Sequence, residues 1–413
     1  MAAEDGDSAG ADRQAVVLSG GGANGAYEVG VLKALFGGLC SSTGYVPLEP
    51  QVFSGTSIGS FNATFLVSRW GEAGGQAAVA ELETVWRERL TRDAGTGGSG
   101  GYRFLANPLE FFDPRRFASD PVGSFARVAG DSLQLLWDFF DRFMYVVNPQ
   151  EEEPLTTRLL HTLAIDNLIS REPFRRVLGE AIEFEAVRGS AKVLKVAATN
   201  WETGEVKEFI NYDFTDNLGP RIIMASSAIP GFFTPQEVGA QPYVDGSVLM
   251  NTPLKTVIVE QARILHVIYL DPDVDSIPIH YLNNVLSTLY RTQVINWAAR
   301  VNDDITDAAN INEALLLLRK ASRGEQVGDL DQRAVLNAIS AFGARVQKAA
   351  RYKLLTIHRY HPRDELGGPL SLLDLRRERI EYLVERGFHD ALRHDCKVSK
   401  CVLPLVPEDA AAG

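Results

Sequence analysis

The sequence GTSIG at residues 55–59 constrains the fold most, because it lies between two segments of different periodicity. Residues 51–54 (QVFS) form a short apolar run typical of a buried strand, and residues 60–70 (SFNATFLVSRW) have the pattern of a helix. A serine in such a turn needs small neighbours, since its backbone is strained and adjacent chain passes close by. The hydroxyl of Ser57 then sits at a helix N-terminus, where an anion is favoured. The pattern predicts a nucleophilic serine on a strand–turn–helix unit.

A second strand–loop–helix unit is predicted at the start of the chain. Residues 15–19 (AVVLS) suggest a buried strand, residues 20–25 (GGGANG) a glycine loop, and residues 26–39 an amphipathic helix. Backbone N–H groups in such a loop can approach a developing oxyanion because no side chain blocks them. The same letters also match the GxGxxG pattern of dinucleotide-binding folds. That alternative needs an acidic residue at the end of the next strand, about 20 residues on, whereas Glu49 lies before that strand.

A serine nucleophile needs a base, and Asp245 is the best candidate. It ends the strand-like run PYVD (242–245) and is followed by Gly246 and Ser247, a turn that would present the carboxylate at the C-terminal edge of a strand. We expect Ser57 at the same edge. A Ser-His-Asp triad is the alternative, and it would require an essential histidine. The seven histidines lack a recognisable catalytic context: His161, His266, His280, His358, His361, His389 and His394.

The remaining pattern predicts an α/β architecture. Strand-like runs return at residues 193–198, 206–210 and 264–270, and helical patterns dominate from residue 276 onward. We expect a mobile N-terminal tail (1–13), a catalytic domain (14–275) and a helical C-terminal region (276–407). A helical insertion is expected at about residues 94–185. It contains a glycine-rich hinge (95–101) and an aromatic segment (133–147) that would be a buried helix or a lid over acyl chains.

Taken together, these motifs resemble those of the patatin-like phospholipase family. The loop GGGANG (20–25), the turn GTSIG (55–59), ASSAIPGFF (225–233) and DGS (245–247) with NTPL (251–254) occur in the family's order. AATNWETGE (197–205) is also similar, so the likeness spans roughly residues 14–275. The resemblance implies a three-layer α/β/α sandwich that hydrolyses lipid acyl esters without a cofactor or metal.

The resemblance also implies a role for each matching residue. Ser57 would attack the ester carbonyl, and Asp245 would accept its proton and return it to the departing alcohol. The oxyanion hole would be formed by Gly20, Gly21 and Gly22, with Asn24 beside it.

Two positions depart from the family pattern, because Asn24 stands where the family has Arg or Lys and Ser247 where it has Gly or Ala. A neutral amide next to the oxyanion loop weakly opposes an anion. Neutral esters such as acylglycerols or lysolipids therefore become more credible substrates, beside phospholipids. A non-catalytic lipid-binding or scaffolding protein that retains the fold is the alternative of a different class.

Charge and cysteine content exclude other classes of protein. The net charge of −12, from 41 basic and 53 acidic residues, argues against a nucleic-acid partner held by a positive field. The three cysteines, Cys40, Cys396 and Cys401, are odd in number and widely spaced, which fits a reducing compartment better than a disulfide framework; their spacing does not suggest a structural metal site.

The chain shows no sign of a membrane span. No apolar run reaches the ~18 to 20 residues that a span needs, and the N-terminus lacks a signal-peptide pattern. Residues 341–400 hold 13 Lys or Arg against 8 Asp or Glu, which could face anionic headgroups. We expect a cytoplasmic protein with a lipid or acyl-ester substrate and at most peripheral membrane contact. The oligomeric state is not predicted.

Overall fold

The computed structural model describes residues 12–91, 100–104, 169–230, 232–270, 285–322, 354–367 and 369–404. Most of the predicted N-terminal tail, most of the glycine-rich hinge, the aromatic segment 133–147 and most of the predicted insertion lie outside these residues.

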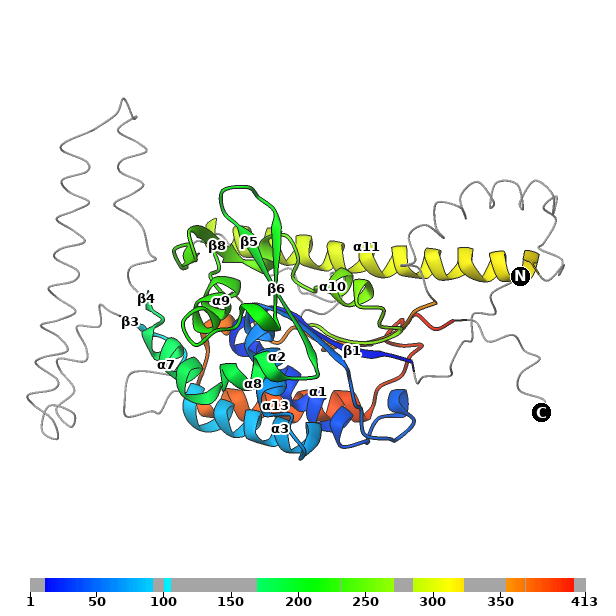
Figure 1. Ribbon diagram of the computed structural model, residues 1–413, viewed down its shortest axis with the longest axis horizontal. Helices are drawn as coiled ribbons and strands as arrows, with labels where there is room; N and C mark the ends of the chain where they lie inside the picture. The colour runs from blue at the N-terminus through cyan, green and yellow to red at the C-terminus, as the bar shows by residue number, and fades with distance from the viewer. Residues whose placement is uncertain are drawn as a thin grey trace, which may run out of the picture.

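The described elements alternate between strands and helices through most of the chain (Figure 1). In chain order they are β1 (Gln14–Leu18), η1 (Gly22–Asn24), α1 (Gly25–Phe36), η2 (Ser41–Thr43), β2 (Val52–Thr56), α2 (Ile58–Arg69), α3 (Gly74–Thr84), the π-helix η3 (Val85–Leu90), β3 (Arg103–Phe104), β4 (Ile169–Ser170), α7 (Glu172–Ala181), α8 (Phe184–Gly189), β5 (Val193–Asn200), β6 (Val206–Ile210), η6 (Asn211–Asp213), α9 (Leu218–Ser226), β7 (Gln236–Val238), β8 (Gln241–Asp245), η7 (Gly246–Val248), α10 (Leu254–Val259), β9 (Ile264–Ile268), α11 (Val285–Ser322), β10 (Thr356–Tyr360), η9 (Pro369–Leu373) and α13 (Arg377–Leu392).

One mixed sheet organises the molecule. Its strand order is β10-β9-β1-β2-β5-β8-β7, and β6 pairs with β5 off this path. The strands from β10 to β5 are mutually parallel, whereas β6 and β8 run antiparallel to β5, and β7 runs antiparallel to β8. The parallel strands β1 and β2 are almost entirely buried, which explains why both read as continuous apolar runs rather than alternating ones.

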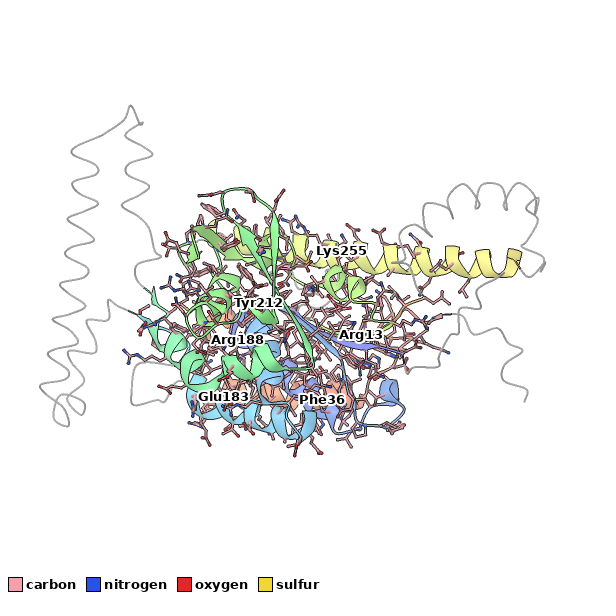
Figure 2. All side chains as sticks on the ribbon, viewed as in Figure 1. Arg13, Phe36, Glu183, Arg188, Tyr212 and Lys255 are labelled. Carbon is pink, nitrogen blue, oxygen red and sulfur yellow. The ribbon has the colours of Figure 1, made fainter. Side chains whose placement is uncertain are left out.

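Helices cover both faces of the sheet. Along β1, Val16 and Leu18 belong to the core shared with α1, α2, α3 and α13, whereas Ala15 and Val17 belong to the core shared with α10 and α11. Because successive residues of a strand point to opposite faces, these two cores lie on opposite sides of the sheet. Figures 1 and 2 show α1, α3 and α13 on one side and α10 and α11 on the other, with side chains filling the space between. The predicted three-layer α/β/α fold is confirmed.

The C-terminal region is helical, as predicted, but it also adds the edge strand β10 to the sheet. That strand, TIHRY, is short and carries a histidine and an arginine, so its sequence gave no apolar run to identify it. Helix α13 packs directly on α1. A β-carbon at Gly30 would overlap the carbonyl oxygen of Val384, and one at Gly387 would overlap that of Tyr27. The two glycines let the helix backbones touch, which fixes α13 behind the glycine loop.

Among the described helices, none is both long enough and apolar enough to span a bilayer.

Candidate active site

Ser57 occupies a strained turn between β2 and α2. Its backbone has φ 55° and ψ −126°, a region that residues other than glycine rarely adopt. The Ser57 N–H donates to the hydroxyl of Ser226 at 2.9 Å, and that hydroxyl donates to the carbonyl of Ala197 in β5 at 2.7 Å. Ser226 therefore ties the turn to the neighbouring strand. The Ser57 side chain is held at the N-terminus of a 12-residue helix, as the sequence predicted.

Asp245 lies beside this turn, at the end of a strand that runs antiparallel to its neighbour β5. β8 is antiparallel to β5, and Asp245 pairs with Ala198, the residue after the one that pairs with Thr56 of β2. Asp245 ends β8, as expected from its sequence, whereas the direction of β8 relative to its neighbours was not predicted. β5 extends past β2, and β8 returns along that extension, so its last residue arrives at the level of Ser57.

Burial controls the protonation of Asp245. Its side chain is fully buried, and this desolvation raises the pKa of the carboxyl to about 6. The backbone N–H of Ser247, the Ser57 hydroxyl and the charge of Arg171 act in the opposite direction. The Ser247 N–H donates to Oδ1 at 2.8 Å, whereas the buried Oδ2 has no hydrogen-bond partner among the described residues. Oδ2 is therefore the oxygen with capacity to accept a proton.

The glycine loop lies against the serine. A β-carbon on Gly20 would come within 2.9 Å of the Ser57 β-carbon and 2.6 Å of Asn251 Oδ1. The Gly20 N–H donates to Asn251 Oδ1 at 3.1 Å, so it is already occupied. The N–H groups of Gly21 and Gly22 have no acceptor in the described part of the chain. Of the three predicted glycine donors, these two remain suited to an oxyanion.

Two arginines near the site could not be found from motif spacing. Arg379 of α13 donates to Asn24 Oδ1 at 3.4 Å, so a guanidinium lies where the sequence suggested that no cation is present. Arg171 donates to the carbonyl of Met224 at 2.7 Å. Burial lowers the Arg171 pKa to about 10 and the nearby Asp245 raises it, so this side chain stays charged at neutral pH. The candidate site thus holds positive charge despite Asn24.

C-terminal segments support both loops of the candidate site. Ser371 of η9 accepts from the Asn24 amide at 3.5 Å, and a β-carbon on Gly22, whose φ is +56°, would overlap the carbonyl oxygen of Leu372. On the other face, the Trp297 indole of α11 donates to the carbonyl of Ser247 at 2.8 Å. The region after residue 285 therefore holds the glycine loop and the aspartate turn in place.

The described histidines do not complete a triad. The hydrogen bonds of His266, His358, His361 and His394 within the described residues go to groups other than Ser57 and Asp245, and the ring of His389 packs against Phe388. His161 and His280 lie outside the described residues. A cavity of about 450 Å³ between α13 and residues 360–363 includes neither member of the dyad. Ser57 is only 3% exposed.

Comparisons with known proteins identify the family of this chain. The family model described as patatin-like phospholipase matches residues 16–258, more than half of the 413-residue chain. Among solved structures, VipD from Legionella pneumophila is similar, with 13% identity and a TM-score of 0.33. The match covers 92% of this chain and 66% of that chain, less than two thirds of its length. A comparison with curated protein sequences gives no match.

Proposed function

This chain belongs to the patatin-like phospholipase family, and membership in that family supports lipid hydrolysis as its general activity. We propose that the protein is a serine esterase that acts through a Ser57–Asp245 dyad. One observation carries the proposal. A serine in a strained turn at a helix N-terminus lies beside a buried aspartate, and one oxygen of that aspartate has no hydrogen-bond partner among the described residues. The substrate would be a carboxylic ester of a phospholipid, lysolipid or acylglycerol.

In the first half-reaction, the Ser57 Oγ attacks the ester carbonyl while its proton moves to Asp245 Oδ2. The bond between Oγ and the carbonyl carbon forms, and the N–H groups of Gly21 and Gly22 stabilise the oxyanion. The bond to the alcohol then breaks, and Asp245 returns the proton to the departing oxygen. In the second half-reaction, water loses a proton to Asp245, attacks the acyl carbon and releases the fatty acid, and the proton returns to Ser57.

The aspartate is suited to this role by its environment. A carboxylate with a pKa of about 6 is a stronger base than one at the ordinary 3.8, yet it remains ionised at neutral pH. The Ser247 N–H holds Oδ1 and so orients Oδ2. The cycle therefore needs no histidine, because Asp245 serves as the base in both half-reactions.

The charge around the site favours substrates that carry an anion. Arg171 and Arg379 together offset the absence of a basic residue at position 24. Phosphate-bearing lipids are therefore as suitable as substrates as neutral esters are. Asn24 alone had favoured neutral esters. Cys40, Cys396 and Cys401 form no disulfide, which is consistent with a protein that works in a reducing, cytoplasmic compartment. Its contact with lipid would be peripheral.

The direct test is release of fatty acid from mixed micelles of phospholipid, lysophospholipid or diacylglycerol. Wild type should hydrolyse at least one class, and Ser57→Ala should reduce the rate to background. Ser68→Ala is the matched control, because Ser68 lies on the same helix and its hydroxyl donates only to Phe65 within that helix. A folded wild type that releases no fatty acid from any class, yet binds the micelles, would favour a non-catalytic lipid-binding protein instead.

A further inference from the structure

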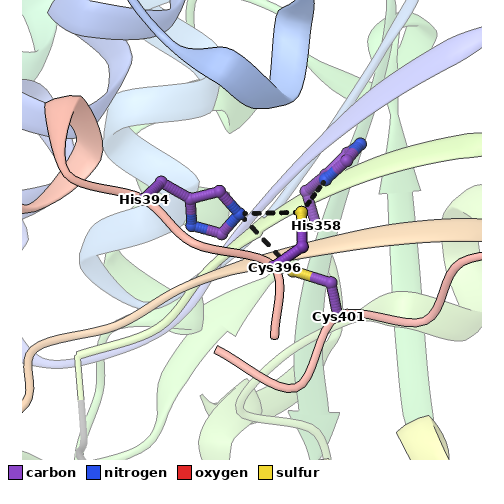
Figure 3. Close-up of side chains that lie close together, drawn as sticks. All are labelled: His358, His394, Cys396 and Cys401. Carbon is purple, nitrogen blue, oxygen red and sulfur yellow. Dashed lines mark hydrogen bonds between the residues drawn. The ribbon is translucent and has the colours of Figure 1, made fainter. Parts of the chain in front are cut away.

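Four side chains with metal-binding atoms converge at the edge of the sheet, away from the dyad (Figure 3). They are His358, His394, Cys396 and Cys401, and one ligand atom from each lies within 4.8 Å of all the others. His358 belongs to the edge strand β10, whereas the other three follow the end of α13. The cluster thus brings together two segments of the chain that are distant in sequence, since His358 and His394 are 36 residues apart.

The distances fit one central ion. Cys396 Sγ lies 3.5 Å from His358 Nδ1 and 3.5 Å from His394 Nε2, and Cys401 Sγ lies 3.5 Å from the same His394 nitrogen. In a tetrahedral zinc site with Zn–S bonds of about 2.3 Å and Zn–N bonds of about 2.05 Å, a sulfur and a nitrogen ligand are about 3.5 Å apart. We propose that these four residues bind a structural zinc ion.

The ligand chemistry selects zinc among common metals. Two cysteines and two histidines are a frequent closed set for structural zinc, whereas calcium and magnesium prefer oxygen ligands. Two thiolates and two neutral imidazoles balance the charge of a divalent ion. A neutral site of this kind suits the partly buried positions of Cys396 and Cys401.

The backbone holds the ligands without help from a metal. Asp395 Oδ1 accepts from the N–H groups of Lys397 and Val398 at 2.7 and 3.2 Å, which forms a tight turn after the first cysteine. The Cys401 N–H donates to the carbonyl of Cys396 at 2.9 Å and closes the loop. Val402 and Ile357 exchange backbone hydrogen bonds at 3.0 and 2.8 Å, so the loop is fixed to β10.

Groups around the ligands complete the site. The Arg359 N–H donates to Cys401 Sγ at 3.3 Å, a contact that stabilises a thiolate. The ring of His266 stacks on that of His358 with 5.1 Å between centroids and limits its rotation. His394 also lines the cavity of about 450 Å³ beside α13, which provides a route for the ion.

The rival interpretation is a disulfide between Cys396 and Cys401. A disulfide would need only the two sulfurs and would leave the approach of two imidazoles unexplained. Both cysteines are free in the structure. The metal would join β10 to the segment after α13. It would also fix the end of the helix that carries Arg379.

The test measures the metal directly and does not require enzymatic activity. Full-length protein, purified with reductant and dialysed against metal-free buffer, should contain one zinc per chain by plasma mass spectrometry. Cys396→Ser/Cys401→Ser should lose it, and Cys40→Ala and His389→Gln should retain it, because neither residue belongs to the cluster. Zinc retained by the double serine variant at the wild-type level would overturn the proposal.

Because the double variant could unfold, wild type provides an independent measurement. After zinc is removed by a chelator, Co²⁺ should restore one equivalent and give the intense visible bands and sulfur charge-transfer band of a tetrahedral cobalt–thiolate site. Removal should also lower the unfolding temperature and expose residues 393–404 to protease. Reduced, folded wild type that takes up neither Zn²⁺ nor Co²⁺, or freshly purified protein with a Cys396–Cys401 disulfide by mass spectrometry, would refute the site.

Discussion

Replacing Asp245 by asparagine should stabilise the fold while it removes activity. The wild-type carboxylate is fully buried, and burial raises its pKa from the ordinary 3.8 to about 6. Each pKa unit corresponds to 1.36 kcal/mol, so ionising this group in the folded protein costs about 3 kcal/mol relative to the unfolded chain. Asparagine keeps an oxygen that can accept from the Ser247 N–H and carries no charge to desolvate.

The pH dependence follows from the sign of that shift. A raised carboxyl pKa means that the folded state binds the proton more tightly, so this group's destabilising effect grows from about pH 3.8 and is complete above pH 6. We therefore expect Asp245→Asn to increase the free energy of unfolding by up to about 3 kcal/mol at pH 7.5 and by about half as much at pH 5. Below pH 4 the two proteins should be nearly equal.

Urea denaturation of both proteins at pH 7.5, 5 and 4, followed by far-ultraviolet circular dichroism, measures this difference. Fatty-acid release on the same samples should fall at least a hundredfold in the variant, in the range expected for loss of a general base. An asparagine variant that is less stable than wild type at pH 7.5, or equally stabilised at all three values, would show that Asp245 is not a strained buried carboxylate.

Three further outcomes are expected. The kcat/KM of wild type should fall about tenfold per pH unit below pH 6 and level off above it, because the base must be ionised; a profile flat to pH 4 would contradict this. Ser226→Ala should cost ~1–3 kcal/mol in urea denaturation and lower kcat, because it leaves the buried Ser57 N–H without an acceptor. Ser227→Ala should change kcat little, because the Ser227 hydroxyl donates to carbonyls in the last turn of α9. Arg379→Gln should slow phospholipid hydrolysis by roughly tenfold or more and diacylglycerol hydrolysis by less. An equal fall in the two rates would show that Arg379 does not recognise phosphate.

The parts of the site that were predictable from the sequence are local. The Ser57 turn and the glycine loop each lie between a strand and a helix that are adjacent in the chain, and a few residues determine such turns. The fold class followed from the same alternation of strands and helices. These features needed no knowledge of long-range pairing.

What was not predictable depends on contacts between distant segments. The direction of β8 is set by its pairing with β5, and a short strand carries no sequence signal for parallel or antiparallel partners. Arg171 and Arg379 reach the site from helical regions whose packing the pattern does not specify. The cysteines were interpreted by their number and spacing, which cannot show that a strand residue as distant as His358 joins Cys396 and Cys401.

The central claim is that Ser57 is an activated nucleophile that depends on Asp245. Fluorophosphonate labelling of the purified protein, with detergent present and the modified peptide located by mass spectrometry, tests it without knowledge of the natural lipid. We predict one labelled residue, Ser57, and loss of labelling in both Ser57→Ala and Asp245→Asn. Labelling that persists in folded Asp245→Asn at the wild-type rate, or no labelling of folded wild type, would contradict the dyad.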